Sequence, residues 1–193
     1  MEVNAMLIYF YGDSNTYGFD PRSYFGGRYT AEHRWVDIFA KATGCEVINA
    51  GENGRKVPRS PLEYPSLPAD VDIFAVMLGT NDLLHSFKTS EVAAHMETFL
   101  TQLCVAREKL LLIAPPPMCD GDFVADKGAI PASYELAQEY FALAAKLGIH
   151  FANAGHWNIG LTFDGVHFSE SGHAAFAEGL GKFFTKSKFN CTI

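Results

Sequence analysis

Residues 7–15 of this 193-residue chain read LIYFYGDSN. The first five side chains are apolar or aromatic, which is typical of a strand buried on both faces of a parallel sheet. The polar turn GDSN then marks the end of the strand. Similar short apolar runs occupy residues 46–49, 73–78, 110–114 and 150–152, so we expect five strands.

Longer amphipathic patterns separate most of these runs and predict helices over residues 32–43, 91–107, 132–147 and 169–184. Thr89 or Ser90 is placed to cap the second helix, and Pro131 stands at the start of the third. The alternation predicts an α/β fold: a three-layer α/β/α sandwich around a flavodoxin-like five-stranded parallel sheet, with residues 1–193 as one domain.

Two segments have no clear element. Residues 52–71 are rich in proline and read as an irregular crossover with room for one short helix. Residues 115–131 begin with three prolines directly after a strand. A long loop at a strand end shapes a binding site about as often as it is a plain surface connection, and both readings stay open here.

The composition argues against several classes of partner. A formal net charge of -7 gives no basic footprint for nucleic acid or an anionic membrane. The first residues lack the features of a signal peptide, and no apolar run is long enough to cross a bilayer, so we expect a cytoplasmic protein. Cys45, Cys104, Cys119 and Cys191 are widely spaced and are expected to be reduced.

Four polar motifs stand at or after predicted strand ends, where open parallel sheets bind their ligands. They are GDSN at 12–15, NAGENG at 49–54, GTND at 79–82 and DGVHFS at 164–169. Each motif alone could be a turn or a helix cap. Together they supply a nucleophile, N–H donors, a base and a carboxylate, which is the set that acyl transfer requires.

In these four motifs the sequence resembles the SGNH (GDSL-like) hydrolases, whose blocks occur here in the same order. The resemblance implies the SGNH hydrolase fold and a serine esterase in which Ser14 is the nucleophile and His167 and Asp164 complete the triad. It also implies an oxyanion hole formed by the backbone of Ser14 and Gly54 and the side chain of Asn81. Gly54 is preferred to Gly51 because the donor glycine of the family lies five residues after the asparagine of that loop.

Residues 8–18, 34–35, 77–82 and 113–117 are similar to the small intracellular arylesterase and acyltransferase branch of this family. That branch implies small-molecule ester substrates with short acyl groups, and some of its members transfer acyl groups to alcohols. A homo-oligomer is expected from this resemblance alone. No cofactor is implied, and the histidine spacing predicts no metal site.

Four residues are candidates for substrate contact. Asn15 replaces the leucine of the commonest family block, and Tyr17 follows the nucleophile turn. Arg34 could contact substrate, or it could pair with Glu32 or a neighbouring loop. His85 could line the pocket or be an ordinary exposed histidine. Tyr17, Phe19, Tyr24 and Phe25 are expected to form an apolar acyl or alcohol pocket, or a patch on which subunits pair. Asp13 and Asp82 are interpreted as acceptors that hold turns.

Other functions are possible on the same residues or the same architecture. A thioesterase, a lysophospholipase or a sugar-ester deacetylase would use the same chemistry with a different pocket. A non-catalytic ligand-binding protein could share the fold. A flavin or nucleotide binder would need a phosphate-binding first loop, where this chain has the carboxylate of Asp13 instead.

Overall fold

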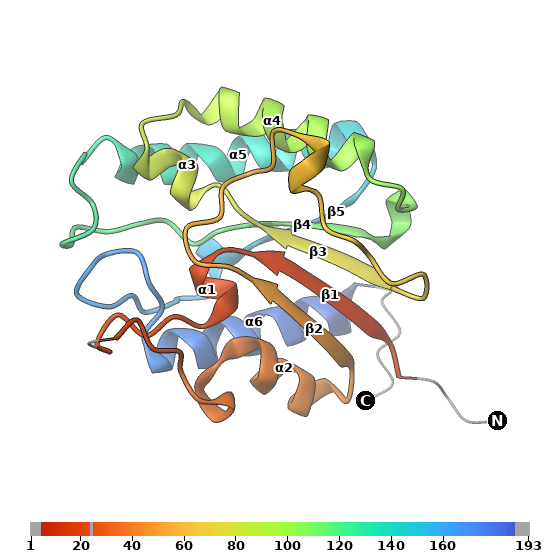
Figure 1. Cartoon of the computed structure of the whole chain (residues 1–193), viewed down its shortest axis with the longest axis horizontal. Helices are drawn as coiled ribbons and strands as arrows, with labels where there is room; N and C mark the ends of the chain where they lie inside the picture. The colour runs from red at the N-terminus through yellow and green to blue at the C-terminus, as the bar shows by residue number, and fades with distance from the viewer. Residues whose placement is uncertain (1–4, 24, 188–193) are drawn as a thin grey trace.

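Five parallel strands form one sheet in the order β2-β1-β3-β4-β5 (Figure 1). The computed structural model describes residues 5–23 and 25–187, so Tyr24 and Cys191 lie outside the described residues. The strands are β1 (Leu7–Gly12), β2 (Glu46–Gly51), β3 (Ile73–Met77), β4 (Leu110–Ala114) and β5 (His150–Asn153). Every neighbouring pair is parallel, as predicted.

Helices cover both faces of the sheet and make the three layers that the sequence predicts. Figure 1 shows α2 (Trp35–Thr43) and α6 (Glu170–Lys186) on one face. The other face carries α4 (Thr89–Gln102), α5 (Ala129–Leu147) and the short α3 (Thr80–Leu84). The predicted α/β fold class is therefore confirmed.

Strand β1 lies between two hydrophobic cores. Tyr11 points into the core under α4 and α5, together with Phe74 and Phe99. Phe10 points into the core under α2 and α6, where it packs edge-on against Trp35 at 4.8 Å. Because successive residues of a strand face opposite sides, a strand between two cores needs an unbroken apolar sequence, which is what residues 7–11 provide.

Helix boundaries differ from those predicted. The first predicted helix, 32–43, is a 3-10 turn at Ala31–His33 followed by α2, because Arg34 between them is extended. The second, 91–107, is α4, which begins at Thr89 and ends at Gln102 because Leu103 is extended. Lys88, rather than Thr89 or Ser90, is the N-cap residue of α4.

The other elements differ by smaller amounts. The third predicted helix starts three residues earlier, at Ala129, so Pro131 stands in the first turn of α5, where its missing N–H costs no hydrogen bond. The fourth is α6, with Ser169 as its N-cap. Strand β2 extends to Gly51 and β3 ends at Met77, one residue before the predicted end. The helices α1 (Ser14–Tyr17) and α3 were not predicted.

The connection from β2 to β3 passes across β1, because β1 lies between these two strands in the sheet. This segment, 52–71, contains only the 3-10 turn Pro61–Glu63. It brings residues 52–57 to the carboxyl end of the sheet, beside the ends of β1 and β3. Within residues 5–23 and 25–187, no helix is long and apolar enough to cross a membrane.

Candidate active site

Ser14 is the first residue of α1, directly after β1. Asp13 caps this helix, since its Oδ1 accepts a hydrogen bond from the Asn15 N–H at 2.9 Å, in line with its interpretation as an acceptor that holds the turn. Gly12 has no room for a side chain: an added Cβ would lie 2.0 Å from the Thr16 Oγ1. This tight turn holds the Ser14 hydroxyl at the end of the strand, with only 6% of the residue exposed.

His167 and Asp164 lie on the loop before α6 and meet Ser14 there. The His167 Nε2 is 3.0 Å from the Ser14 Oγ, and the His167 Nδ1 is 2.6 Å from the Asp164 Oδ2. The structure thus brings together the three residues predicted as a triad, although Ser14 is 150 positions from Asp164 and 153 from His167 in sequence.

The carboxylate of Asp164 is held in its ionised form. Its burial would raise the pKa, but the hydrogen bond from the His167 side chain and those from the backbone N–H groups of His167 and Val166 lower the pKa to about 2. The Asp164 Oδ1 also accepts the Thr162 hydroxyl at 2.8 Å. A fixed negative charge beside the imidazole favours a proton on Nδ1 and leaves Nε2 facing Ser14 as an acceptor.

Asn15 connects the nucleophile turn to the histidine loop. Its Nδ2 donates to the Val166 carbonyl at 3.1 Å, and its Oδ1 accepts the Phe168 N–H at 2.9 Å. The buried Trp35 indole N–H also donates to the Asn15 carbonyl, at 2.9 Å. The side-chain amide of Asn15 therefore joins the nucleophile turn to the histidine loop, and its contact with substrate stays a prediction.

A small cavity opens beside the Ser14 hydroxyl and has a volume of about 180 Å³. Both Gly54 and Asn81 line this cavity, so the structure places the predicted oxyanion residues around one space. The Asn81 Nδ2 gives one hydrogen to the Arg55 carbonyl at 3.1 Å, and an amide nitrogen carries two. The other residues that line the cavity are Phe19, Asn53, Leu84, Phe123, Val166 and His167.

Two further carboxylates are buried near the site. Burial raises the pKa of Asp13 to about 6, against the lowering effect of the Asn15 N–H. Burial likewise raises the pKa of Asp82, although two hydrogen bonds lower it. The Asp82 carboxylate accepts these from the Val57 N–H at 3.0 Å and from the Arg59 guanidinium at 3.3 Å. Asp82 thus holds the 55–59 segment next to α3, in line with its interpretation as a structural acceptor.

Three more predicted substrate contacts do not line the cavity. The Tyr17 ring lies under the Arg28 guanidinium at 4.4 Å. Arg34 pairs with Asp37 at 2.7 and 3.0 Å, one helical turn along α2, and not with Glu32. The His85 Nδ1 lies 2.7 Å from the Asn81 carbonyl at the end of α3.

Four residues that line the cavity are not singled out by the sequence: Asn53, Leu84, Phe123 and Val166. Phe19 was among the predicted aromatic candidates, whereas Phe25 is 97% exposed. Leu84 stands on the unpredicted helix α3, and Phe123 comes from the 115–131 loop. The sequence leaves open that this loop shapes a binding site, but it does not single out Phe123 or Leu84, because their position depends on how separate segments pack together.

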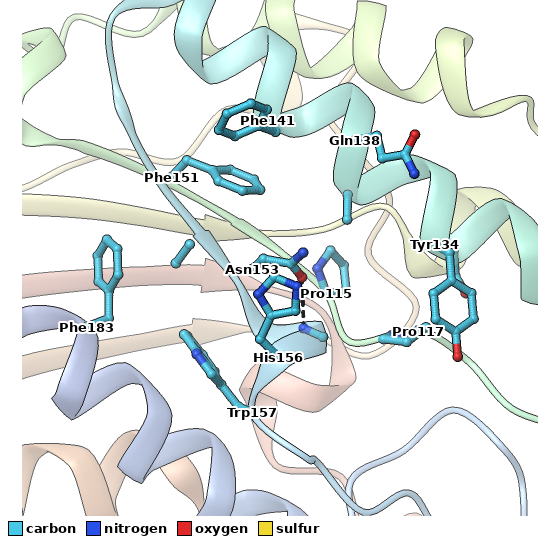
Figure 2. Close-up of a pocket in the computed structure, with 14 residues that line it drawn as sticks. Pro115, Pro117, Tyr134, Gln138, Phe141, Phe151, Asn153, His156, Trp157 and Phe183 are labelled. Carbon is cyan, nitrogen blue, oxygen red and sulfur yellow. Dashed lines mark hydrogen bonds between the residues drawn. The ribbon is translucent and has the colours of Figure 1, made fainter.

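A larger hollow lies along the edge strand β5, with a volume of about 760 Å³. Figure 2 shows it between Phe141 on α5 and Trp157, with His156 near the middle. Ser14, Asp164 and His167 do not line this hollow. The volume of a hollow therefore does not indicate where the candidate catalytic residues lie in this molecule.

Comparison with known proteins identifies the family. Residues 10–175 match the model of the GDSL-like lipase/acylhydrolase family. The chain belongs to this family, and it is a carboxylic-ester hydrolase. The predicted family, fold and enzyme class are confirmed, and this membership favours an enzyme over the non-catalytic and flavin-binding alternatives.

Solved structures support the same assignment. A proposed arylesterase from Agrobacterium tumefaciens is 28% identical, with a TM-score of 0.77, and the match covers 94% of this chain and 99% of that one. An aryl esterase from M. smegmatis is 25% identical, with a TM-score of 0.78, and the match again covers 94% of this chain and 99% of that one. A carbohydrate acetylesterase from Sinorhizobium meliloti is 23% identical, with a TM-score of 0.79, and the match covers 94% of this chain and 99% of that one. At this identity the similarity supports the fold alone. No curated protein matches the chain.

Proposed function

We propose that residues 1–193 form one serine esterase domain that hydrolyses short-chain acyl esters through an acyl-enzyme. Ser14 is the nucleophile, His167 the general base and acid, and Asp164 the orienting carboxylate. The observation that carries this proposal is the continuous chain of contacts from Ser14 Oγ to His167 Nε2 at 3.0 Å and from His167 Nδ1 to Asp164 Oδ2 at 2.6 Å.

The reaction follows from this geometry. The Ser14 Oγ bonds to the ester carbonyl carbon as its proton passes to the His167 Nε2, and the carbonyl π electrons move onto the oxygen. When the tetrahedral intermediate collapses, the bond to the alcohol oxygen breaks and His167 returns the proton to that oxygen. Water then attacks the acyl-enzyme with the same base, which releases the acid and restores Ser14.

The developing oxyanion needs N–H donors. The Ser14 amide is in the first turn of α1, where backbone N–H groups have no partner within the helix. Asn81, which keeps a second Nδ2 hydrogen, and Gly54 line the same cavity, and we assign the other two donors to them. Each such donor lowers the barrier by roughly 3 kcal/mol.

The size and lining of the cavity support a small substrate. A volume of about 180 Å³ is smaller than the roughly 300 Å³ at which ordinary ligand pockets begin. Phe19, Leu84, Phe123 and Val166 make most of its walls apolar. Short acyl groups such as acetyl, on aryl or simple alkyl alcohols, suit this space better than the long chains of a lysophospholipase.

The test is hydrolysis of p-nitrophenyl acetate, butyrate and octanoate by the wild type and by Ser14→Ala, combined with labelling by a phosphonate that reacts with activated serines. We expect turnover that falls from acetate to octanoate, and at least a thousandfold lower kcat in Ser14→Ala. The phosphonate should label Ser14. Equal turnover in the variant, or label on another residue, would overturn the triad assignment.

A further inference from the structure

The segment 119–124, within the loop after β4, runs along the loop that carries Asp164 and His167. The Cys119 N–H donates to the Gly165 carbonyl at 3.1 Å, and the Phe123 N–H donates to the Asp164 carbonyl at 3.0 Å. Between them, the Asp122 N–H reaches the Phe163 carbonyl at 3.4 Å. The two loops are thus joined by their backbones along several residues.

Glycines allow this close approach. A Cβ on Gly121 would lie 2.2 Å from the Asp164 carbonyl carbon, and a Cβ on Gly165 would lie 2.4 Å from the Cys119 carbonyl oxygen. Gly165 also has a φ of 79°, which favours glycine. Neither loop can shift against the other by much without losing these contacts.

The same segment is anchored on its other side to the core. Val124, next to Phe123, is fully buried in the core under α4 and α5. Earlier in the loop, the Met118 N–H donates to the Ser133 hydroxyl of α5 at 3.0 Å. Phe123 therefore stands between fixed points, although 56% of the residue is exposed.

Its ring lies against His167. The Phe123 and His167 ring centroids are 5.6 Å apart at 87°, an edge-to-face contact, and Phe19 lies 4.7 Å from the same imidazole. Both phenylalanines also line the cavity beside Ser14. The imidazole is thus flanked by two apolar rings at the mouth of the site.

The position of the imidazole decides which half of an ester meets these rings. In the proposed reaction the His167 Nε2 gives its proton to the departing alcohol oxygen, so that oxygen must come within hydrogen-bond reach of Nε2. The carbonyl oxygen instead faces the donors of Ser14, Gly54 and Asn81. The alcohol half of the ester therefore leaves along the side of the cavity that carries Phe19 and Phe123.

We infer that Phe123 is a specificity-determining residue that contacts the alcohol part of the ester and leaves the choice of acyl group unaffected. This inference rests on the proposed function. It gives the 115–131 loop a role, as a brace for the Asp164–His167 loop and as a wall of the alcohol side.

The experiment compares two ratios of kcat/KM, which covers the steps up to the acyl-enzyme. The first ratio is phenyl acetate to ethyl acetate, which varies the alcohol, and the second is p-nitrophenyl acetate to p-nitrophenyl butyrate, which varies the acyl group. In Phe123→Ala we expect the first ratio to fall on the order of tenfold and the second to stay within about twofold. Phe123→Leu, which keeps an apolar contact, should give an intermediate first ratio.

Phe141→Ala is the matched control, because Phe141 is 63% exposed and lies in the β5 hollow away from Ser14. Both of its ratios should equal those of the wild type. A changed acyl ratio with an unchanged alcohol ratio in Phe123→Ala would overturn the inference, as would ratios equal to those of Phe141→Ala. Full turnover by Ser14→Ala in the same assays would instead refute the proposed function.

Discussion

Asp164 is buried and yet accepts four hydrogen bonds. Its Oδ1 accepts the Thr162 hydroxyl and the N–H groups of Val166 and His167 at 2.8 to 2.9 Å, and its Oδ2 accepts the His167 Nδ1–H. One carboxylate thereby shapes the 162–167 turn and orients the imidazole. Structure and proposed chemistry depend on the same two oxygens.

This arrangement predicts the effect of Asp164→Asn. Three donors face the Oδ1 position, so the amide oxygen should stay there and the NH₂ should face the His167 Nδ1. The imidazole proton would then sit on Nε2, which could no longer accept the Ser14 proton, and we expect kcat to fall about 10,000-fold. Steady-state hydrolysis of p-nitrophenyl acetate measures this loss.

Asp122→Asn is the control for that variant, because Asp122 is exposed on the neighbouring loop and the change removes the same charge. Its kcat should stay within about twofold of the wild type, and circular dichroism should show both variants folded. A fall of less than tenfold in Asp164→Asn would mean that Asp164 does not set the tautomer of His167.

The individual residues of the site differ in how far the sequence could predict them. Ser14, Asn81, Asp164 and His167 stand in four short motifs, and these motifs taken together, with the family resemblance they carry, were enough to single them out. Phe123 could not be found in this way, because its ring meets His167 only after two loops have packed. The hydrogen bonds of Asn15 to the 166–168 backbone could not be predicted either, because these two segments meet only in the folded chain.

At the scale of elements, strands were easier to predict than helix ends. Strand β3 is buried at every residue, and its unbroken apolar sequence fixed its position to within one residue. Helix ends depend on single backbone angles, such as the extended Arg34 before α2 and the extended Leu103 after α4. Apolar spacing does not encode those angles.

The two loops beside His167 make a prediction for Gly121→Ala. The added Cβ would meet the Asp164 backbone at 2.2 Å, so one loop must move. We expect the free energy of unfolding to fall by about 1–3 kcal/mol, and kcat to fall because Asp164 and His167 shift together. Urea unfolding and ester hydrolysis measure the two effects.

Gly181→Ala provides the contrast. Gly181 lies within α6, and a Cβ there would meet nothing within 4 Å. Alanine in place of a helical glycine should raise the free energy of unfolding by about 0.5–1 kcal/mol and leave kcat unchanged. If Gly121→Ala had the same free energy of unfolding and the same kcat as the wild type, the close contact between the loops would not matter for stability or activity.

At the scale of the whole molecule, the core under α2 and α6 contains a buried histidine. His173 is 0% exposed, and its ring packs on Tyr29 at 5.0 Å and on Phe168 at 5.3 Å. Its Nδ1 accepts a hydrogen bond from the backbone N–H of Trp35 at 3.4 Å, while its Nε2 has no hydrogen-bond partner among the described residues. A neutral imidazole with its proton on Nε2 fits this site, and a charged one does not.

Burial therefore lowers the pKa of His173 to about 4, with the nearby His167 and Arg34 adding to the effect. The ordinary value is 6.5, so the unfolded chain binds this proton more readily than the folded chain between pH 6.5 and pH 4. The free energy of unfolding that depends on a neutral His173 is fully present above pH 6.5 and is lost as the pH falls toward 4. The loss amounts to roughly 3 kcal/mol across this window.

His173→Gln keeps an acceptor for the Trp35 N–H and removes the titrating group. Between pH 6.5 and pH 4, we expect the wild type to lose roughly 3 kcal/mol of unfolding free energy relative to this variant, as measured by urea unfolding at several pH values. The pKa of Asp13 is raised to about 6, so protonation of Asp13 increases the free energy of unfolding as the pH falls. Asp13 is present in both proteins, and its effect cancels from the difference. His156→Gln, at an exposed position, should follow the wild type. A constant difference between wild type and His173→Gln over the whole range would show that His173 does not contribute to acid unfolding.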